Sequence, residues 1–78
     1  MTITARLYAG VRERVGEPTI EVSGTTVAEV RASLAKACPP IADLLPACRF
    51  ALNDEFVDEE TPVPDGSILD VIPPVSGG

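Results

Sequence analysis

The stretch SGTTVAEVRASLAKACPP, residues 23–40, decides the fold, because it predicts one amphipathic helix with a clear start and a clear stop. Thr26 can cap the first turn while Glu29, three residues on, reaches back in a capping box. Pro39 and Pro40 end the helix, since proline cannot continue its hydrogen-bond ladder. Apolar residues recur at helical spacing and form one stripe that faces a core. They are Val27, Val30, Leu34, Ala37 and Cys38.

Before this helix, two short segments predict strands. The segment TITARLY, residues 2–8, alternates apolar and polar side chains with period two, which is typical of a half-buried strand and places Tyr8 on the outer face. After a connection that ends at Gly16, the segment PTIEV, residues 18–22, predicts a second strand. We expect the two strands to pair as a hairpin with a long loop.

After the helix, IADLLP, residues 41–46, can form at most one helical turn, and two further strands follow. The segments RFAL and EFV flank Asn53-Asp54, a residue pair that favours a tight turn. Phe50 and Leu52 share one face of the first of these strands, so we expect both side chains in the core. The pattern predicts another antiparallel pair.

The last predicted strand is SILDVI, residues 67–72. Its side chains alternate, and a charged Asp70 belongs in water, so its face is predicted to be the outer one and Ile72 shares it. Taken in order, the elements are two strands, one helix and three strands. They predict an α+β domain over residues 1–72, in which one main helix packs on a mixed five-stranded sheet.

Length, composition and charge limit the possible functions. The 78 residues allow one small domain, which is too small for a deep active-site cleft. No apolar run approaches the ~20 residues of a membrane span, and no signal peptide opens the chain, so we expect a cytoplasmic protein that does not bind membranes. With no histidine and two cysteines, Cys38 and Cys48, we expect buried free thiols and no metal site.

Charge is distributed unevenly along the chain. Residues 1–49 hold six basic and five acidic residues, a net +1, whereas residues 50–78 hold seven acidic and no basic residues, a net −7. This disfavours nucleic acid as a partner and favours a protein with a basic surface. The alternative is an acidic face that only improves solubility.

The C-terminal segment PPVSGG, residues 73–78, is the most unusual part of the sequence. The chain offers no histidine, no nucleophile elbow and no glycine-rich phosphate loop, so an active site within the domain is not expected. Pro73 and Pro74 favour an extended stalk, and Gly77 and Gly78 allow the backbone to enter a narrow channel with an open terminal carboxylate. Any chemistry is therefore expected on this tail, which we predict to be extended and flexible.

With these features together, the whole chain resembles the ubiquitin-like sulfur carriers of the β-grasp fold, and most closely the small-subunit family of molybdopterin synthase. LYAGVRERVG is similar to that family's first strand and following turn, TTVAEVRASL to its helix, and PDGSILDVIPPVSGG to its last strand and tail. The match covers nearly the whole chain, and PPVSGG is its most specific part.

The resemblance implies a carrier cycle centred on Gly78. An adenylating enzyme uses ATP to activate the Gly78 carboxyl group, a sulfur donor converts it to a thiocarboxylate, and the large synthase subunit uses that sulfur on cyclic pyranopterin monophosphate. Catalysis lies in the partners, and this chain alone binds no cofactor. The resemblance also implies a heterotetramer of two small and two large subunits. In this chain, the tail residues between Pro74 and Gly77 are Val75 and Ser76.

The resemblance further implies that the partner binds apolar residues on the exposed sheet face. Tyr8, Phe56 and Ile72 occupy the matching positions in this chain. The strand phases place Tyr8 and Ile72 outside independently, but Phe56 has no clear phase in its short strand.

Three other functions remain open from the sequence. One is a sulfur carrier for thiazole or cysteine biosynthesis, against which the Pro73-Pro74 pair argues. Another is a ubiquitin-like protein modifier. The single lysine, Lys36, argues against polymeric chains linked through this protein but does not exclude single conjugation. The third is a structural interaction domain, for which trimming the two glycines would change nothing.

Overall fold

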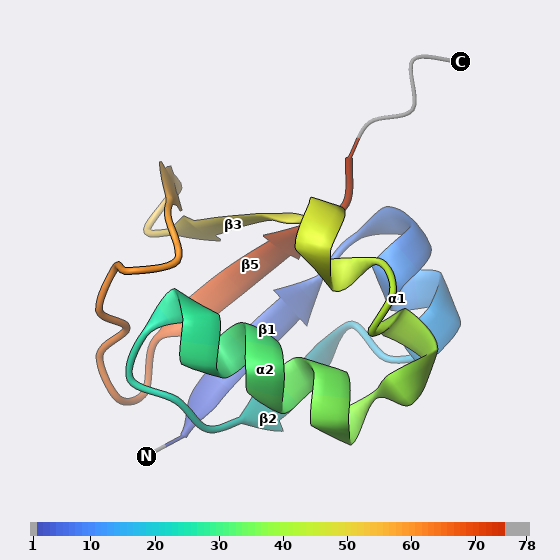
Figure 1. Cartoon of the computed structure of the whole chain (residues 1–78), viewed down its shortest axis with the longest axis horizontal. Helices are drawn as coiled ribbons and strands as arrows, with labels where there is room; N and C mark the ends of the chain where they lie inside the picture. The colour runs from blue at the N-terminus through green and yellow to red at the C-terminus, as the bar shows by residue number, and fades with distance from the viewer. Residues whose placement is uncertain (1, 75–78) are drawn as a thin grey trace.

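A mixed five-stranded sheet forms the framework of residues 2–74, the part of the chain that this computed structural model describes (Figure 1). The strands are β1 (Ile3–Leu7), β2 (Thr19–Val22), β3 (Arg49–Leu52), β4 (Glu55–Val57) and β5 (Ile68–Ile72). Their spatial order is β2-β1-β5-β3-β4. β1 and β5 run parallel, and the other neighbouring pairs are antiparallel. The first and last strands of the chain therefore lie side by side at the centre of the sheet.

Helix α2 (Val27–Ala37) crosses one face of this sheet, as the sequence predicts, and gives the β-grasp arrangement (Figure 1). The Thr26 hydroxyl oxygen accepts a hydrogen bond from the Glu29 backbone N–H at 3.2 Å. The Glu29 carboxylate reaches back one residue further than a standard capping box, to the backbone N–H and the hydroxyl of Thr25, both at 2.8 Å. These bonds, the backbone one first, lower the pKa of Glu29. The helix thus begins at a well-satisfied cap.

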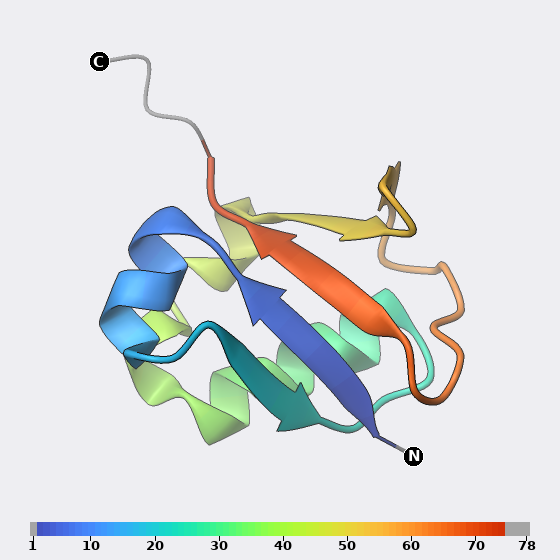
Figure 2. The ribbon, with the colours of Figure 1, turned by 180° about the vertical axis from the view of Figure 1, so that it is seen from behind.

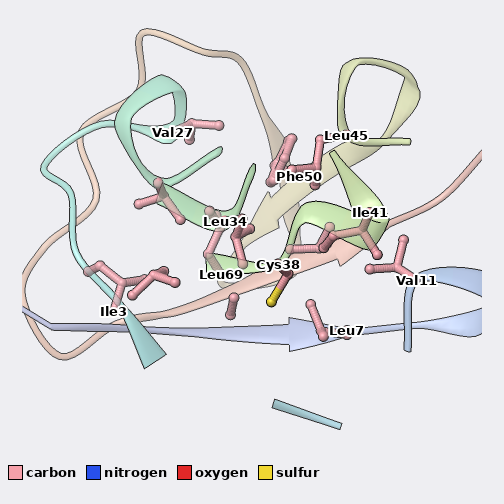
Figure 3. Close-up of a cluster of buried hydrophobic side chains, with 14 of the residues drawn as sticks. Ile3, Leu7, Val11, Val27, Leu34, Cys38, Ile41, Leu45, Phe50 and Leu69 are labelled. Atoms are coloured by element: carbon pink, nitrogen blue, oxygen red, sulfur yellow. The ribbon is translucent and has the colours of Figure 1, made fainter. Parts of the chain in front are cut away.

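The core lies between α2 and the sheet (Figure 3). Val27, Val30 and Leu34 are fully buried, and Cys38 is 7% exposed. Ala37 was expected in the same stripe but is exposed. The helix ends at Ala37, and Cys38, whose backbone has left the helical conformation (φ −131°, ψ 74°), turns into the core instead. Burial of these apolar side chains against the sheet stabilises the domain.

The connection between β1 and β2 contains a second helix that the sequence did not predict. α1 (Ala9–Val15) replaces the expected turn and packs at one end of the sheet (Figure 2). Val11 is fully buried and Val15, one turn later, packs against the core. Gly16 ends the helix with a left-handed φ of 85°, and its N–H donates to the Arg12 carbonyl at 2.8 Å. The predicted boundary at Gly16 is therefore a helix C-cap.

Between α2 and β3 the chain makes two short 3₁₀ turns, η1 (Pro39–Ile41) and η2 (Leu45–Ala47), where one helical turn was expected. Ile41 and Leu45 are buried beneath them. Within the described chain both cysteines are free thiols. Cys38 is buried as expected, but Cys48 is only half-buried, and that burial raises the pKa of its thiol.

The acidic segment after β4 lies against the start of α2. The first two helical N–H groups, of Val27 and Ala28, donate to the carbonyls of Thr61 and Glu59 at 3.1 and 3.0 Å. The Glu59 carboxylate also forms an ion pair with Arg31 of α2. Negative charge at a helix N-terminus is favourable, so part of the acidic run stabilises the helix.

Among residues 2–74, no helix combines the length and the apolar character that a membrane crossing requires.

Candidate functional site: a groove on the open face of the sheet

The candidate site lies on the sheet face opposite α2, which Figure 2 shows in front of the helix. One row of side chains crosses this face from strand to strand. The register pairs Arg6 of β1 with Asp70 of β5, Asp70 with Ala51 of β3, and Ala51 with Phe56 of β4. Residues that stand directly opposite one another in neighbouring strands point to the same face of the sheet, so these four side chains share the open face.

A groove of about 620 Å³ runs along this face beside the end of β5. The structure brings together in its lining all the site residues that the sequence proposed within the described chain. They are Tyr8, Phe56, Ile72, Pro73 and Pro74. The other proposed tail residues lie outside the described residues, namely Val75, Ser76, Gly77 and Gly78.

Two exposed aromatic rings form opposite parts of the groove. Tyr8 is 37% exposed and Phe56 is 63% exposed, while Ile72 is half-buried between them along the sheet. An arginine stacks over each ring: the Arg6 guanidinium carbon lies 6.0 Å from the Tyr8 ring centre, and that of Arg49 lies 5.2 Å from the Phe56 ring centre. Such contacts hold the ring faces in place.

The turn between β3 and β4 sets the phase of Phe56, which the sequence could not assign. Asn53 and Asp54 have positive φ values of 52° and 65°, the geometry of a type I′ hairpin turn. This two-residue turn pairs Leu52 with Glu55, and consequently Ala51 with Phe56. Phe56 therefore points to the open face, together with Tyr8.

Asp70 corrects one step of the sequence argument. It lies on the open face as predicted, but it is only 7% exposed, so its carboxylate is not in water. Asp70 Oδ1 accepts hydrogen bonds from Arg6 Nε at 2.6 Å and from the Tyr8 hydroxyl at 3.1 Å, and Oδ2 accepts from Arg6 Nη2 at 3.3 Å. The hydrogen bond and the charge of Asp70 raise the pKa of Arg6. A buried charge is tolerated here because it is paired and hydrogen-bonded.

Sequence reasoning missed several residues that line or support the groove. Ala51 lines the groove. The sequence could have indicated this, because Ala51 lies between Phe50 and Leu52, which were expected in the core, and therefore points to the opposite face of the sheet. Ala9, which follows Tyr8, also lines the groove and has a left-handed φ of 47°. Alanine rarely adopts this conformation, so nothing in the local sequence indicates it. Arg6 shares the outward phase of Tyr8 in β1, but its partner Asp70 is 64 residues away in the sequence.

The chemistry of the groove suits binding. Of the described residues in its lining, the ionisable side chains are Tyr8, Asp54 and Asp70, and the Asp70 carboxylate is held in an ion pair. A general base must reach a proton of its substrate, which a carboxylate held by Arg6 is poorly placed to do. An apolar groove with two aromatic walls is instead typical of a protein contact surface.

A family pattern and a known relative both match nearly the whole chain. The ThiS family pattern matches residues 5–78 of this chain. A relative from Chlamydomonas reinhardtii, a molybdopterin synthase sulfur carrier subunit, is 34% identical over 83 residues, covering 100% of both proteins.

Two solved structures resemble the fold. One is a chain of the complex of subunits 1 and 2 of the molybdopterin-converting factor from Helicobacter pylori 26695, with 28% identity, a TM-score of 0.73 and 100% coverage of both chains. The other is the small archaeal modifier protein 1 from Methanosarcina acetivorans, with a TM-score of 0.88. It is 24% identical, with 99% of this chain and 96% of that chain covered, so it shows the fold alone.

Proposed function

This chain belongs to the ThiS family, and on that basis we propose that it is the sulfur carrier subunit of a molybdopterin synthase. The observation that supports this most directly is its 34% identity to a molybdopterin synthase sulfur carrier over the full length of both proteins. The geometry agrees, because the central strand β5 ends at Ile72 and continues into Pro73 and Pro74 at the groove. The segment that carries Gly77 and Gly78 thus follows directly from the candidate contact surface.

In the proposed cycle the reacting atom is the terminal carboxyl of Gly78. An adenylating enzyme joins it to AMP from ATP and releases pyrophosphate, which makes the carbonyl carbon electrophilic. Donor sulfur at the oxidation level of sulfide attacks that carbon, AMP leaves, and the terminus becomes a thiocarboxylate. Its sulfur is now a nucleophile that attacks cyclic pyranopterin monophosphate in the large subunit, and water then cleaves the C–S bond and returns Gly78 to a carboxylate. We place this cycle in the cytoplasm, where ATP is available.

The groove is the proposed docking surface for the large subunit. Tyr8 and Phe56 expose their rings, and Ile72 links them to the start of the tail. Buried aromatic anchors dominate the energy of many protein interfaces. In the Helicobacter pylori structure, a chain of the same fold is found in a complex of subunits 1 and 2. We propose the same pairing here, as a heterotetramer of two small and two large subunits.

The proposal is tested by deleting Gly78. The deletion withdraws the terminus by ~3.3 Å, which is more than catalytic alignment tolerates, so activity should be lost. Gly77→Ala should fail or nearly fail, because it adds a Cβ where a narrow channel has no room. Ser76→Ala is the matched control and should retain activity. The melting temperature of each variant shows whether it folds.

Two measurements are made separately, because adenylation and sulfur transfer use different partners. Intact mass after incubation with ATP, the adenylating enzyme and the sulfur donor reports replacement of one oxygen by sulfur. Molybdopterin formation with the large subunit reports delivery. A protein lacking Gly78 that still forms the thiocarboxylate and supports molybdopterin formation would contradict the carrier function. Isopeptide conjugates on target lysines in the same mixture would favour a modifier instead.

A further inference from the structure

We infer that Asp70 is a positioning residue for the groove, because its buried carboxylate fixes the Tyr8 ring and sets the direction of the Tyr8 hydroxyl bond. A partner must then present a hydrogen-bond donor, an N–H or O–H group, at the Tyr8 hydroxyl. The inference rests on the proposed function, since it names the polarity of the group that the large subunit brings to the groove.

The carboxylate of Asp70 is itself held firmly. Two nitrogen atoms of Arg6, Nε and Nη2, donate to its two oxygens at 2.6 and 3.3 Å. Arg6 stands directly across the parallel β1–β5 ladder from Asp70, and Ala51 stands on the other side. The side chain of Asp70 is 10% exposed, so little water competes for it. A fork-shaped contact of this kind fixes the orientation as well as the charge of the carboxylate.

Tyr8 is held by both its main chain and its side chain. Its backbone carbonyl accepts from the N–H groups of Val11 and Arg12 at 3.2 and 3.3 Å, at the start of α1. Its hydroxyl oxygen lies 3.1 Å from Asp70 Oδ1. Without this second contact, the side chain of Tyr8, a residue that is 37% exposed, would keep only the Arg6 guanidinium over its ring as a polar partner. With it, the ring is ordered before the partner arrives, which lowers the entropic cost of binding.

The chemistry of the pair also fixes which group donates. An ionised carboxylate paired with Arg6 only accepts hydrogen bonds, so the Tyr8 hydroxyl must donate its single proton to Asp70. The hydroxyl oxygen keeps lone pairs that can only accept. A partner carbonyl or carboxylate placed there would meet an acceptor, which is unfavourable, whereas a partner amide, indole or hydroxyl group would complete the network.

The test is a double-mutant cycle on the full chain, with affinity for the purified large subunit of the same organism as the readout. Tyr8→Phe keeps the ring but removes the hydroxyl, and Asp70→Ala removes the carboxylate. We expect each change to weaken binding by roughly fivefold to tenfold, and the double variant to bind no more weakly than the weaker single variant. Independent effects, whose fold-changes multiply, would overturn the inference.

Asp43→Ala is the matched control. Asp43 is also paired with an arginine, Arg14 at 3.3 Å, but it is exposed and does not line the groove. The substitution makes the same change in charge and side chain as Asp70→Ala. Affinity within about twofold of wild type is expected, since surface ion pairs contribute little.

A second readout needs no partner. Tyr8 is the only tyrosine and the chain has no tryptophan, so the near-ultraviolet circular dichroism of the tyrosine band reports how firmly this ring is held. Asp70→Ala should weaken the band while the far-ultraviolet spectrum stays unchanged, and an unchanged tyrosine band would overturn the positioning role. If wild-type protein fails to bind the large subunit, the proposed function fails, and the spectrum still decides whether Asp70 holds Tyr8.

Discussion

The two faces of the same sheet have different tasks, and β5 shows the contrast most clearly. Leu69 and Val71 point toward α2 and are fully buried among apolar side chains. Asp70, between them, points to the open face and is nearly as buried, but its carboxylate is hydrogen-bonded to a charged and an aromatic side chain, Arg6 and Tyr8. Burial on the inner face serves folding, whereas burial on the open face orders groups that remain beside a groove. Substitutions should therefore separate stability from binding along a single strand.

The largest effect is expected from Leu69→Ala on the inner face. Removing a fully buried leucine leaves a cavity and costs about 2–5 kcal/mol of unfolding free energy, a large share of the stability of a domain this small. Ile68→Ala, one residue earlier and 48% exposed, should change it by less than about 0.5 kcal/mol. Urea denaturation of both variants measures the difference. Similar losses from the two would contradict the division between faces.

An intermediate loss of stability is expected from Arg6→Met. The methionine keeps an apolar stem but leaves the Asp70 carboxylate with only the Tyr8 hydroxyl as a partner. An unpaired buried charge destabilises the fold, although the half-exposed position of Arg6 lets water replace part of the contact. The urea concentration at the midpoint of unfolding should fall between the midpoints of Leu69→Ala and Ile68→Ala. Adding Asp70→Ala to Arg6→Met should restore stability, and a further loss in that double variant would show that the pair is not the cause.

A small change in stability, together with a large change in binding, is expected from Ala51→Leu. Ala51 lines the groove and is only 6% exposed, so the added atoms of a leucine there occupy the groove rather than the core on the other side of the sheet. We expect an unfolding free energy within about 0.5 kcal/mol of wild type and a loss of large-subunit affinity of roughly tenfold or more. Calorimetry of folding and of binding measures both. Unchanged affinity would exclude the groove as the docking surface.

The main helix and the five strands could be predicted because their signals are local. The cap at Thr26, the period of the apolar stripe and the prolines after Cys38 are all contained in residues 23–40. The first and last strands show alternation within residues 2–8 and 67–72. The Asn53-Asp54 turn was equally readable, since few residue pairs accept two positive φ values.

Helix α1 was missed because its signals are weak. It has seven residues, includes Gly10 and begins at Ala9 with a left-handed φ, all of which disfavour a helix locally. Only Val11 and Val15, one turn apart, mark its buried side. Packing of these two residues on the core outweighs the poor propensity.

The polar part of the groove depends on contacts between distant segments. Nothing near Asp70 in the sequence indicates a partner, because Arg6 and Tyr8 are 64 and 62 residues away. The parallel pairing of β1 with β5 brings them together. The rule that charged side chains lie in water therefore placed Asp70 on the correct face of the sheet, but it wrongly predicted that the carboxylate would be exposed.

The central position of β5 has a mechanical consequence. A load applied along the axis of β5 at its C-terminal end acts on a strand that is hydrogen-bonded to β1 on one side and to β3 on the other. Such a load shears many ladder bonds together instead of opening them one at a time, as it would at a strand peeled from a sheet edge. The described domain is thus built to resist tension applied along its last strand.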